Sequence, residues 1–194
     1  VAVLGETGLF EQLAQENIKR FEAAGVRKIV TLSPHGFHAI KNEYPRFGGS
    51  FEVYHYPQLL AGLLEKGEFR QEQPPLRITF HDPCYLGRHN KDYRPPRAVL
   101  GALPGIELQE MDRAMGDALC CGGGGGNAFT DVLGGGPESA SRVRVREAAE
   151  SGAEVLAVAC PKCARMFEDA IKDECLEDAL RVADVAEIVQ ERCA

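Results

Sequence analysis

The chain has 194 residues, of which 44% are hydrophobic, enough to bury one sizeable core or two small lobes around a shared one. Its formal net charge of -7 and its lack of a basic cluster argue against nucleic acid as a partner and against binding to an anionic membrane surface. No stretch reaches the roughly 18 apolar residues that a membrane span requires, and no charged-then-apolar signal segment opens the chain, so we expect no direct membrane span in it.

Runs rich in valine and isoleucine alternate with helical patterns along the chain, an order typical of parallel strands joined by crossover helices. The predicted strands are 1–4, 28–32, 51–54, 76–80, 106–108 and 155–158. The predicted helices are 9–24, 37–44, 57–65, 95–103, 139–151, 164–172 and 185–192. The first helix ends at Gly25, a residue suited to a left-handed C-terminal turn. We therefore predict an α/β fold.

An internal repeat relates residues 25–36 to residues 152–163, and both segments read as glycine, strand, then a proline turn that opens a helix. Ser33 then occupies the position of Cys160, and Gly36 that of Cys163. We predict two pseudo-repeated lobes with small, mostly parallel sheets, a degenerate lobe at 1–70 and a complete one at 76–194. A linker is expected at 67–75, where glycine, charge and two prolines interrupt the apolar pattern.

The first lobe is shorter than the second by about twenty residues in the interval before its proline turn. The difference falls between Glu6 and Leu9, and it is either a deletion or a gap that the numbering runs across. Because the chain begins at Val1 in a predicted strand, without an initiator methionine, we expect it to be a fragment of a longer protein.

Five of the seven cysteines form a pattern that predicts a metal site. They are Cys84, the vicinal pair Cys120 and Cys121, and the two cysteines of Cys160-Pro-Lys-Cys163. The last motif follows a strand and opens a helix, whose positive end favours thiolate, the form that binds metals. Alone, this motif fits a redox dithiol or half a zinc site. Three further cysteines favour an iron-sulfur cluster instead, because a soft-metal cluster needs several thiolates from separate loops.

Cys175 and Cys193 lie outside the pattern, and we expect neither to bind metal. The odd number of cysteines, the vicinal pair and the absence of an export signal favour a reduced compartment over disulfides. We therefore expect a cytoplasmic location.

Glycines and histidines flank the predicted metal site. Five glycines follow the vicinal cysteines, and we expect Gly122 and Gly123 to let the backbone approach a cofactor closely. A phosphate-binding loop is disfavoured, because the Lys-Ser/Thr of a Walker motif is missing. His81, in His-Asp-Pro-Cys84 at a strand end, is a candidate hydrogen-bond partner of a cluster sulfide, and a purely structural histidine is the alternative. His35 is a candidate for a lobe interface.

This arrangement of cysteines resembles the cysteine-rich CCG domain found in the B and D subunits of heterodisulfide reductase. The segments 41–45, 81–90 and 96–98 are similar to those of the iron-sulfur oxidoreductases of that family found with acyl-CoA and electron-transfer-flavoprotein pathways. The resemblance implies a noncubane [4Fe-4S] cluster with one thiolate able to bridge irons. Its ligands would be Cys84, Cys120, Cys121, Cys160 and Cys163. The first lobe has Ser33 and Gly36 at the matching positions, so we expect no second cluster of this kind.

We therefore predict an electron-transfer module, a fragment or subunit of a heterodisulfide-reductase-like oxidoreductase. The resemblance implies a redox partner, either a flavoprotein or a ferredoxin-like domain, and a small thiol or disulfide as a candidate substrate. It also allows membrane association through other domains or subunits, since family members sometimes carry membrane helices. The alternatives are a structural zinc module and a metal-free thiol-disulfide exchanger.

Overall fold

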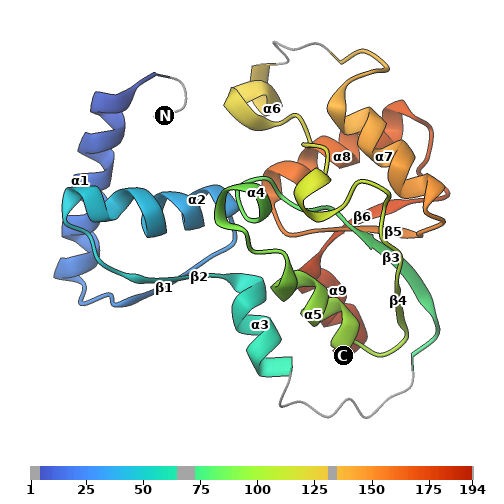
Figure 1. Cartoon of the computed structure of the whole chain (residues 1–194), viewed down its shortest axis with the longest axis horizontal. Coiled ribbons are helices and arrows are strands. Elements are labelled where there is room, and N and C mark those ends of the chain that lie inside the picture. Colours follow the sequence, from blue (N-terminus) through green and yellow to red (C-terminus); the bar gives the residue numbers. More distant parts are fainter. Residues whose placement is uncertain (1–4, 65–72, 131–134, 194) are drawn as a thin grey trace.

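A computed structural model describes residues 5–64, 73–130 and 135–193 (Figure 1). Within these ranges the chain is a mixed α/β protein with two small sheets, both entirely parallel. The predicted fold class is thus confirmed. The strand predicted at 1–4 lies outside the described residues. No helix in the described ranges is long and apolar enough to cross a membrane.

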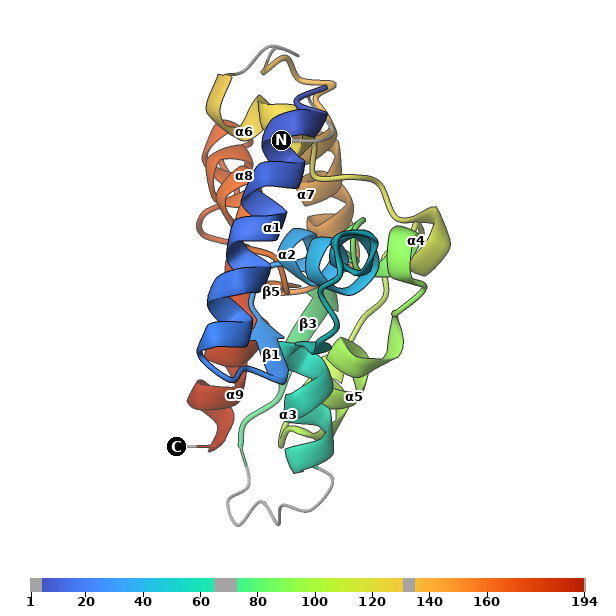
Figure 2. The same cartoon turned by 90° about the vertical axis from the view of Figure 1, so that its left-hand side faces the viewer.

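The smaller sheet pairs β1 (Lys28–Thr31) with β2 (Glu52–His55). Helix α1 (Thr7–Ala23) precedes it, and α2 (Pro34–His38), a π-helical turn (Ala39–Glu43) and a 3-10 turn (Tyr44–Phe47) connect its strands. Ala14 and Ile18 of α1 pack against Tyr44 in a separate small core. Figure 2 looks onto this side of the molecule and shows α1 running along its outer face, with α2 behind it.

The larger sheet has the strand order β4-β3-β5-β6. Its strands are β3 (Leu76–Phe80), β4 (Ile106–Leu108), β5 (Val155–Val158) and β6 (Arg181–Asp184). The helices of this part are α4 (Gly87–Asn90), α5 (Arg94–Ala102), α6 (Asn127–Thr130), α7 (Ala140–Glu150), α8 (Pro161–Asp173) and α9 (Val185–Cys193). Helix α3 (Tyr56–Leu64) follows β2 but packs on α5.

Two apolar layers enclose the larger sheet. One contains Ile78, Phe80 and Val155 together with residues of α3, α5 and α9. The other contains Leu156, Val158 and residues of α7 and α8. Every residue of the central strand β5 is buried, because both of its faces and both of its edges are covered. Figure 1 shows the two helix groups on opposite sides of the sheet.

Most predicted elements are present, and the differences have local causes. Helices α2 and α8 begin at Pro34 and Pro161, three residues earlier than predicted, because proline is well tolerated in the first helical position. Strand β6 was not predicted, since Arg181–Asp184 holds only two apolar residues. The short helices α4 and α6 were also missed, being too short for a helical period to show.

Candidate metal centre

The structure brings the five predicted cysteine ligands to one edge of the larger sheet. Cys84 lies in the loop after β3, and Cys160 is the N-cap of α8, directly after β5. Cys163 is in the first turn of α8, and the vicinal pair lies in the loop between β4 and α6. Because β3 and β5 are adjacent and parallel, their carboxyl ends meet, and the loops that follow them converge.

The five thiol groups form a continuous series of contacts. Cys84 hydrogen-bonds with Cys120, and Cys120 with Cys121. The Cys121 and Cys163 sulfur atoms lie 3.3 Å apart, and Cys163 also contacts Cys160. Cys121, Cys160 and Cys163 are buried, whereas Cys84 and Cys120 are partly exposed. Both remaining cysteines, Cys175 and Cys193, are exposed.

The five thiol groups differ in the direction in which their pKa is shifted. Hydrogen bonds from Cys121 and then Cys84 lower the pKa of Cys120, and one from Cys163 lowers the pKa of Cys160 to about 4. The bond to Cys120 raises the pKa of Cys121 to about 12, and hydrogen bonding also raises the pKa of Cys84 and Cys163. Cys120 and Cys160 are therefore the two of the five thiols whose lowered pKa favours the thiolate form. Metal binding at this site would release protons, because thiolate is the ligand form.

The glycines after the vicinal pair meet two separate demands. Gly122 has φ +78°, a conformation that side chains disfavour, and its N–H donates to the Cys120 sulfur at 3.4 Å. A Cβ atom on Gly123 would lie 2.9 Å from Cγ of Met166. The first glycine is thus required by backbone conformation and the second by close packing on α8.

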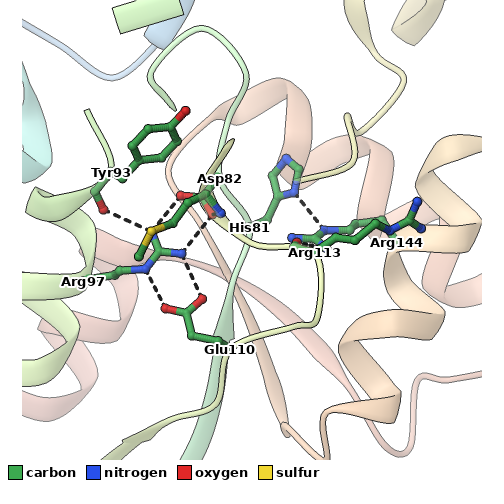
Figure 3. Close-up of polar contacts among 8 residues, drawn as sticks. His81, Asp82, Tyr93, Arg97, Glu110, Arg113 and Arg144 are labelled. Carbon is green, nitrogen blue, oxygen red and sulfur yellow. Dashed lines mark hydrogen bonds and ion pairs between the residues drawn. The ribbon is translucent and has the colours of Figure 1, made fainter. Parts of the chain in front are cut away.

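His81 is a buried residue at the end of β3 that faces the cysteines. Its Nδ1 atom lies 3.4 Å from Nε of Arg144 (Figure 3), and Phe167 packs edge-on against its ring, with centroids 4.6 Å apart. One of its ring nitrogens lies within 4.8 Å of the sulfur atoms of Cys121 and Cys163. Burial, aided by the charge of Arg144, lowers the pKa of His81 to about 3. The ring is therefore neutral at physiological pH.

An ion-pair network fixes the loops that carry the cysteines. Asp82 accepts two hydrogen bonds from Arg97, at 2.7 and 2.9 Å, and one from the backbone N–H of Met115 at 2.7 Å (Figure 3). Arg97 also binds Glu110, at 2.6 and 2.9 Å, and the carbonyl of Tyr93. The loop leading to Cys120 is therefore anchored to the loop that holds Cys84.

Sequence reasoning did not identify Arg144, or a role for Asp82 and Arg97. Arg144 stands among other arginines in α7, where nothing in the pattern distinguishes it. Asp82 lies within the His-Asp-Pro-Cys motif, which is a signal that could have identified it.

The smaller sheet also contributes to the site. His35, at the start of α2, hydrogen-bonds with Cys160, and its ring lies 4.1 Å from that of Tyr85 between centroids. His35 thus faces the larger sheet, as hypothesised. Ser33, like Cys160, is an N-cap followed by a proline, and its hydroxyl accepts a hydrogen bond from the N–H of Gly36 at the start of α2. Serine therefore serves helix capping at this position.

The donor set fits a soft-metal cluster. Five sulfur atoms joined in one series of contacts exceed the four ligands of a tetrahedral zinc site. Among the described residues, the buried Nε2 atom of His81 has no hydrogen-bond partner, as expected for a group that faces a bound species. A zinc ion held by His81, Cys121 and Cys163 would leave three of the five sulfur atoms unused.

Comparisons with known proteins identify cysteine-rich and iron-sulfur-binding relatives of this chain. A family model described as "Cysteine-rich domain" (CCG) matches residues 1–41 and 78–168, which include all five cysteines and His81. "Probable iron-sulfur-binding oxidoreductase FadF" of Bacillus subtilis is 42% identical over 96% of the chain, and "EtfAB:quinone oxidoreductase" of Syntrophomonas wolfei is 38% identical over 96%. One subunit of the dihydromethanophenazine:CoB--CoM heterodisulfide reductase of Methanosarcina barkeri is 37% identical over 93%. The chain spans 26%, 27% and 44% of these relatives.

Proposed function

The chain belongs to the family of cysteine-rich CCG domains, and on that premise we propose that it is an iron-sulfur electron-transfer module. The observation that carries the proposal is the continuous series of five thiol contacts at one edge of a parallel sheet. The name of the FadF relative, a probable iron-sulfur-binding oxidoreductase, supports the same function. We infer the division of the chain proposed from its sequence, with a degenerate repeat at 1–70 and a complete, cluster-binding repeat at 76–194.

The cofactor that we propose is one noncubane [4Fe-4S] cluster. Its ligands are Cys84, Cys120, Cys121, Cys160 and Cys163. A cubane cluster takes four cysteines, so a fifth sulfur in the same series of contacts favours an open cluster with a bridging thiolate. When bound, the cluster would take up and release single electrons.

The surrounding residues have separate roles in this proposal. Gly122 donates its backbone N–H to the Cys120 sulfur, and Gly123 brings the loop onto α8. His81 faces the same sulfur atoms from the end of β3. Burial of three of the cysteines keeps water from the sulfur atoms, and both burial and hydrogen bonds to sulfur set the potential of such a centre.

The partner that we propose is a flavoprotein or a ferredoxin-like domain. The name of the EtfAB:quinone oxidoreductase relative, of which the chain spans 27%, supports a flavoprotein. The name of the heterodisulfide reductase relative supports a small thiol or disulfide as substrate, next to the partly exposed Cys84 and Cys120. A cytoplasmic location, with membrane association through other subunits, stays a prediction.

Metal analysis of the protein tests the function directly. After anaerobic purification and reconstitution, we expect a brown protein with broad visible absorption that contains four irons and four acid-labile sulfides per chain. A colourless protein with stoichiometric zinc would refute the proposal in favour of a structural zinc module. A metal-free protein whose dithiols reduce disulfides would refute it in favour of a thiol-disulfide exchanger.

A further inference from the structure

A buried guanidinium group stands behind His81, on the side away from the cysteines. Arg144 is fully buried on α7. Its Nη1 donates to the carbonyl of Arg113 at 2.7 Å and pairs with Glu147 at 2.8 Å, and its Nε lies 3.4 Å from Nδ1 of His81 (Figure 3). These partners hold the side chain in one orientation, so its contact with the imidazole is built into the fold.

The contact decides where His81 carries its proton. A guanidinium group has only N–H donors, so Nδ1 must accept and must be unprotonated. The proton of the neutral ring then resides on Nε2. This atom is buried, and no described residue accepts a hydrogen bond from it. Since a ring nitrogen of His81 lies within 4.8 Å of two cysteine sulfurs and Nδ1 is occupied by Arg144, Nε2 is the atom directed at the metal centre.

A metal-binding histidine would need the opposite arrangement. To bind a metal through Nε2, the ring must offer a lone pair there and carry its proton on Nδ1, where it would meet the Nε–H of Arg144. The arginine thus disfavours metal binding by His81 and favours hydrogen-bond donation from it. His81 therefore has a different role from the five cysteines, although it lies beside them.

We propose that Arg144 is a positioning residue that fixes His81 as a hydrogen-bond donor to the sulfur atoms of the metal centre, and that the Arg144–His81 pair raises the reduction potential of the metal centre. The inference rests on the proposed function, because it requires a bound cluster. A donor and a buried positive charge both stabilise the extra negative charge of the reduced state. Removing either should therefore make reduction less favourable.

The test combines three variants with a spectroscopic redox titration. We expect His81→Phe to keep its iron, to lose an exchangeable proton coupling in electron-nuclear double resonance, and to shift the potential to a more negative value. Arg144→Lys keeps the charge but loses the fork that reaches Nδ1, so we expect a shift of the same sign. In the double variant, we expect no shift beyond that of His81→Phe, because Arg144 acts through His81.

Arg142→Lys is the matched control, since Arg142 lies on the same helix and binds Glu174 at 2.5 Å. We expect it to keep the wild-type potential. Three outcomes would each overturn the inference. They are an unchanged potential in His81→Phe, a full additional shift when Arg144→Lys is added to His81→Phe, and loss of iron from His81→Phe.

A measurement on the unsubstituted protein covers the case in which a buried variant does not fold. In protein labelled with nitrogen-15 at histidine, electron spin echo modulation should show only the weak nitrogen coupling of a hydrogen-bonded ring. The strong coupling of a nitrogen bound to iron would overturn the inference. A wild-type chain without iron and sulfide would refute the proposed function as well, so the two failures are distinguishable.

Discussion

Cys84 is the most separate of the five clustered cysteines. It comes from a loop of its own after β3, it is partly exposed, and its thiol hydrogen-bonds with Cys120 at the end of the series of contacts. Cys163, by contrast, is buried and contacts both Cys121 and Cys160. The outermost donor therefore decides whether the site holds four thiolates or five.

We predict that Cys84→Ser disrupts the cluster, because a hydroxyl group is a poor ligand for iron compared with a thiolate. The visible spectrum should change, and the iron content per chain should fall well below that of the wild type. Cys193→Ser, which removes an exposed cysteine at the end of α9, is the matched control and should leave both unchanged. An unaltered spectrum and iron content in Cys84→Ser would remove this residue from the ligand set.

His55 is a buried imidazole outside the metal centre. It is fully buried at the end of β2, its Nε2 lies 3.2 Å from the carbonyl oxygen of Leu32, and burial lowers its pKa to about 4. In the unfolded chain the pKa is about 6.5. The unfolded state thus binds more protons between these values, so the stability from neutral His55 is complete above pH 6.5 and is lost as pH falls toward 4.

Between pH 7.5 and pH 5, we predict that the wild type loses about 2 kcal/mol more of its free energy of unfolding than His55→Gln does. Thermal unfolding midpoints of both proteins at the two pH values measure the difference. His89→Gln, which removes an exposed imidazole, should keep the wild-type loss. Equal losses of unfolding free energy in the wild type and in His55→Gln would contradict the assignment of this pH dependence to His55.

At the scale of elements, the parallel sheet explains why the site assembles where it does. The apolar strands β3 and β5 lie buried side by side in the sheet. Because they are parallel, their carboxyl ends carry the two cysteine-bearing loops to one edge. The Asp82–Arg97 pair then ties α5 and the loop at Met115 to the end of β3. The strands set the position of the loops, and the ion pair holds their geometry.

The sequence predicted this arrangement in part. Cysteine spacing singled out the five cysteines that the structure brings together, and apolar runs predicted β3 and β5, because both signals are local. The contact of Arg144 with His81 joins positions 63 apart, and that of Asp82 with Met115 positions 33 apart, so no periodic pattern reports them. Strand β6 is an edge strand with charged residues at both ends, which hid it as well.

We predict that Asp82→Asn lowers the free energy of unfolding by about 3 kcal/mol, because it removes one of the two carboxylates that pair with the largely buried Arg97. For a chain of this size, the unfolding midpoint should fall by roughly 6–12 °C. Glu110→Gln removes the same charge from Arg97 at a more exposed position and should cost less. Equal losses in the two variants would show that the link to Met115 adds nothing.

At the scale of the whole molecule, two polar contacts join the first part of the chain to the part that forms the larger sheet. The Tyr56 hydroxyl donates to Asp184 at 2.7 Å, and Asn42 bonds Asn90 at 2.8 Å. In the same first part of the chain, His35 hydrogen-bonds with Cys160 and packs against the ring of Tyr85, the neighbour of Cys84. A half of the molecule that lacks cysteine ligands therefore supplies one wall of the site.

This wall should protect the cluster from oxygen. We predict that His35→Ala speeds the loss of visible absorbance in air several-fold, because it opens a path to the sulfur of Cys160 and removes a hydrogen bond from it. His35→Phe restores the ring without the hydrogen bond, so a rate near that of the wild type would assign the protection to coverage of the site. A rate near that of His35→Ala would assign it to the hydrogen bond. If His35→Ala decays as slowly as the wild type, the smaller sheet does not shield the metal centre.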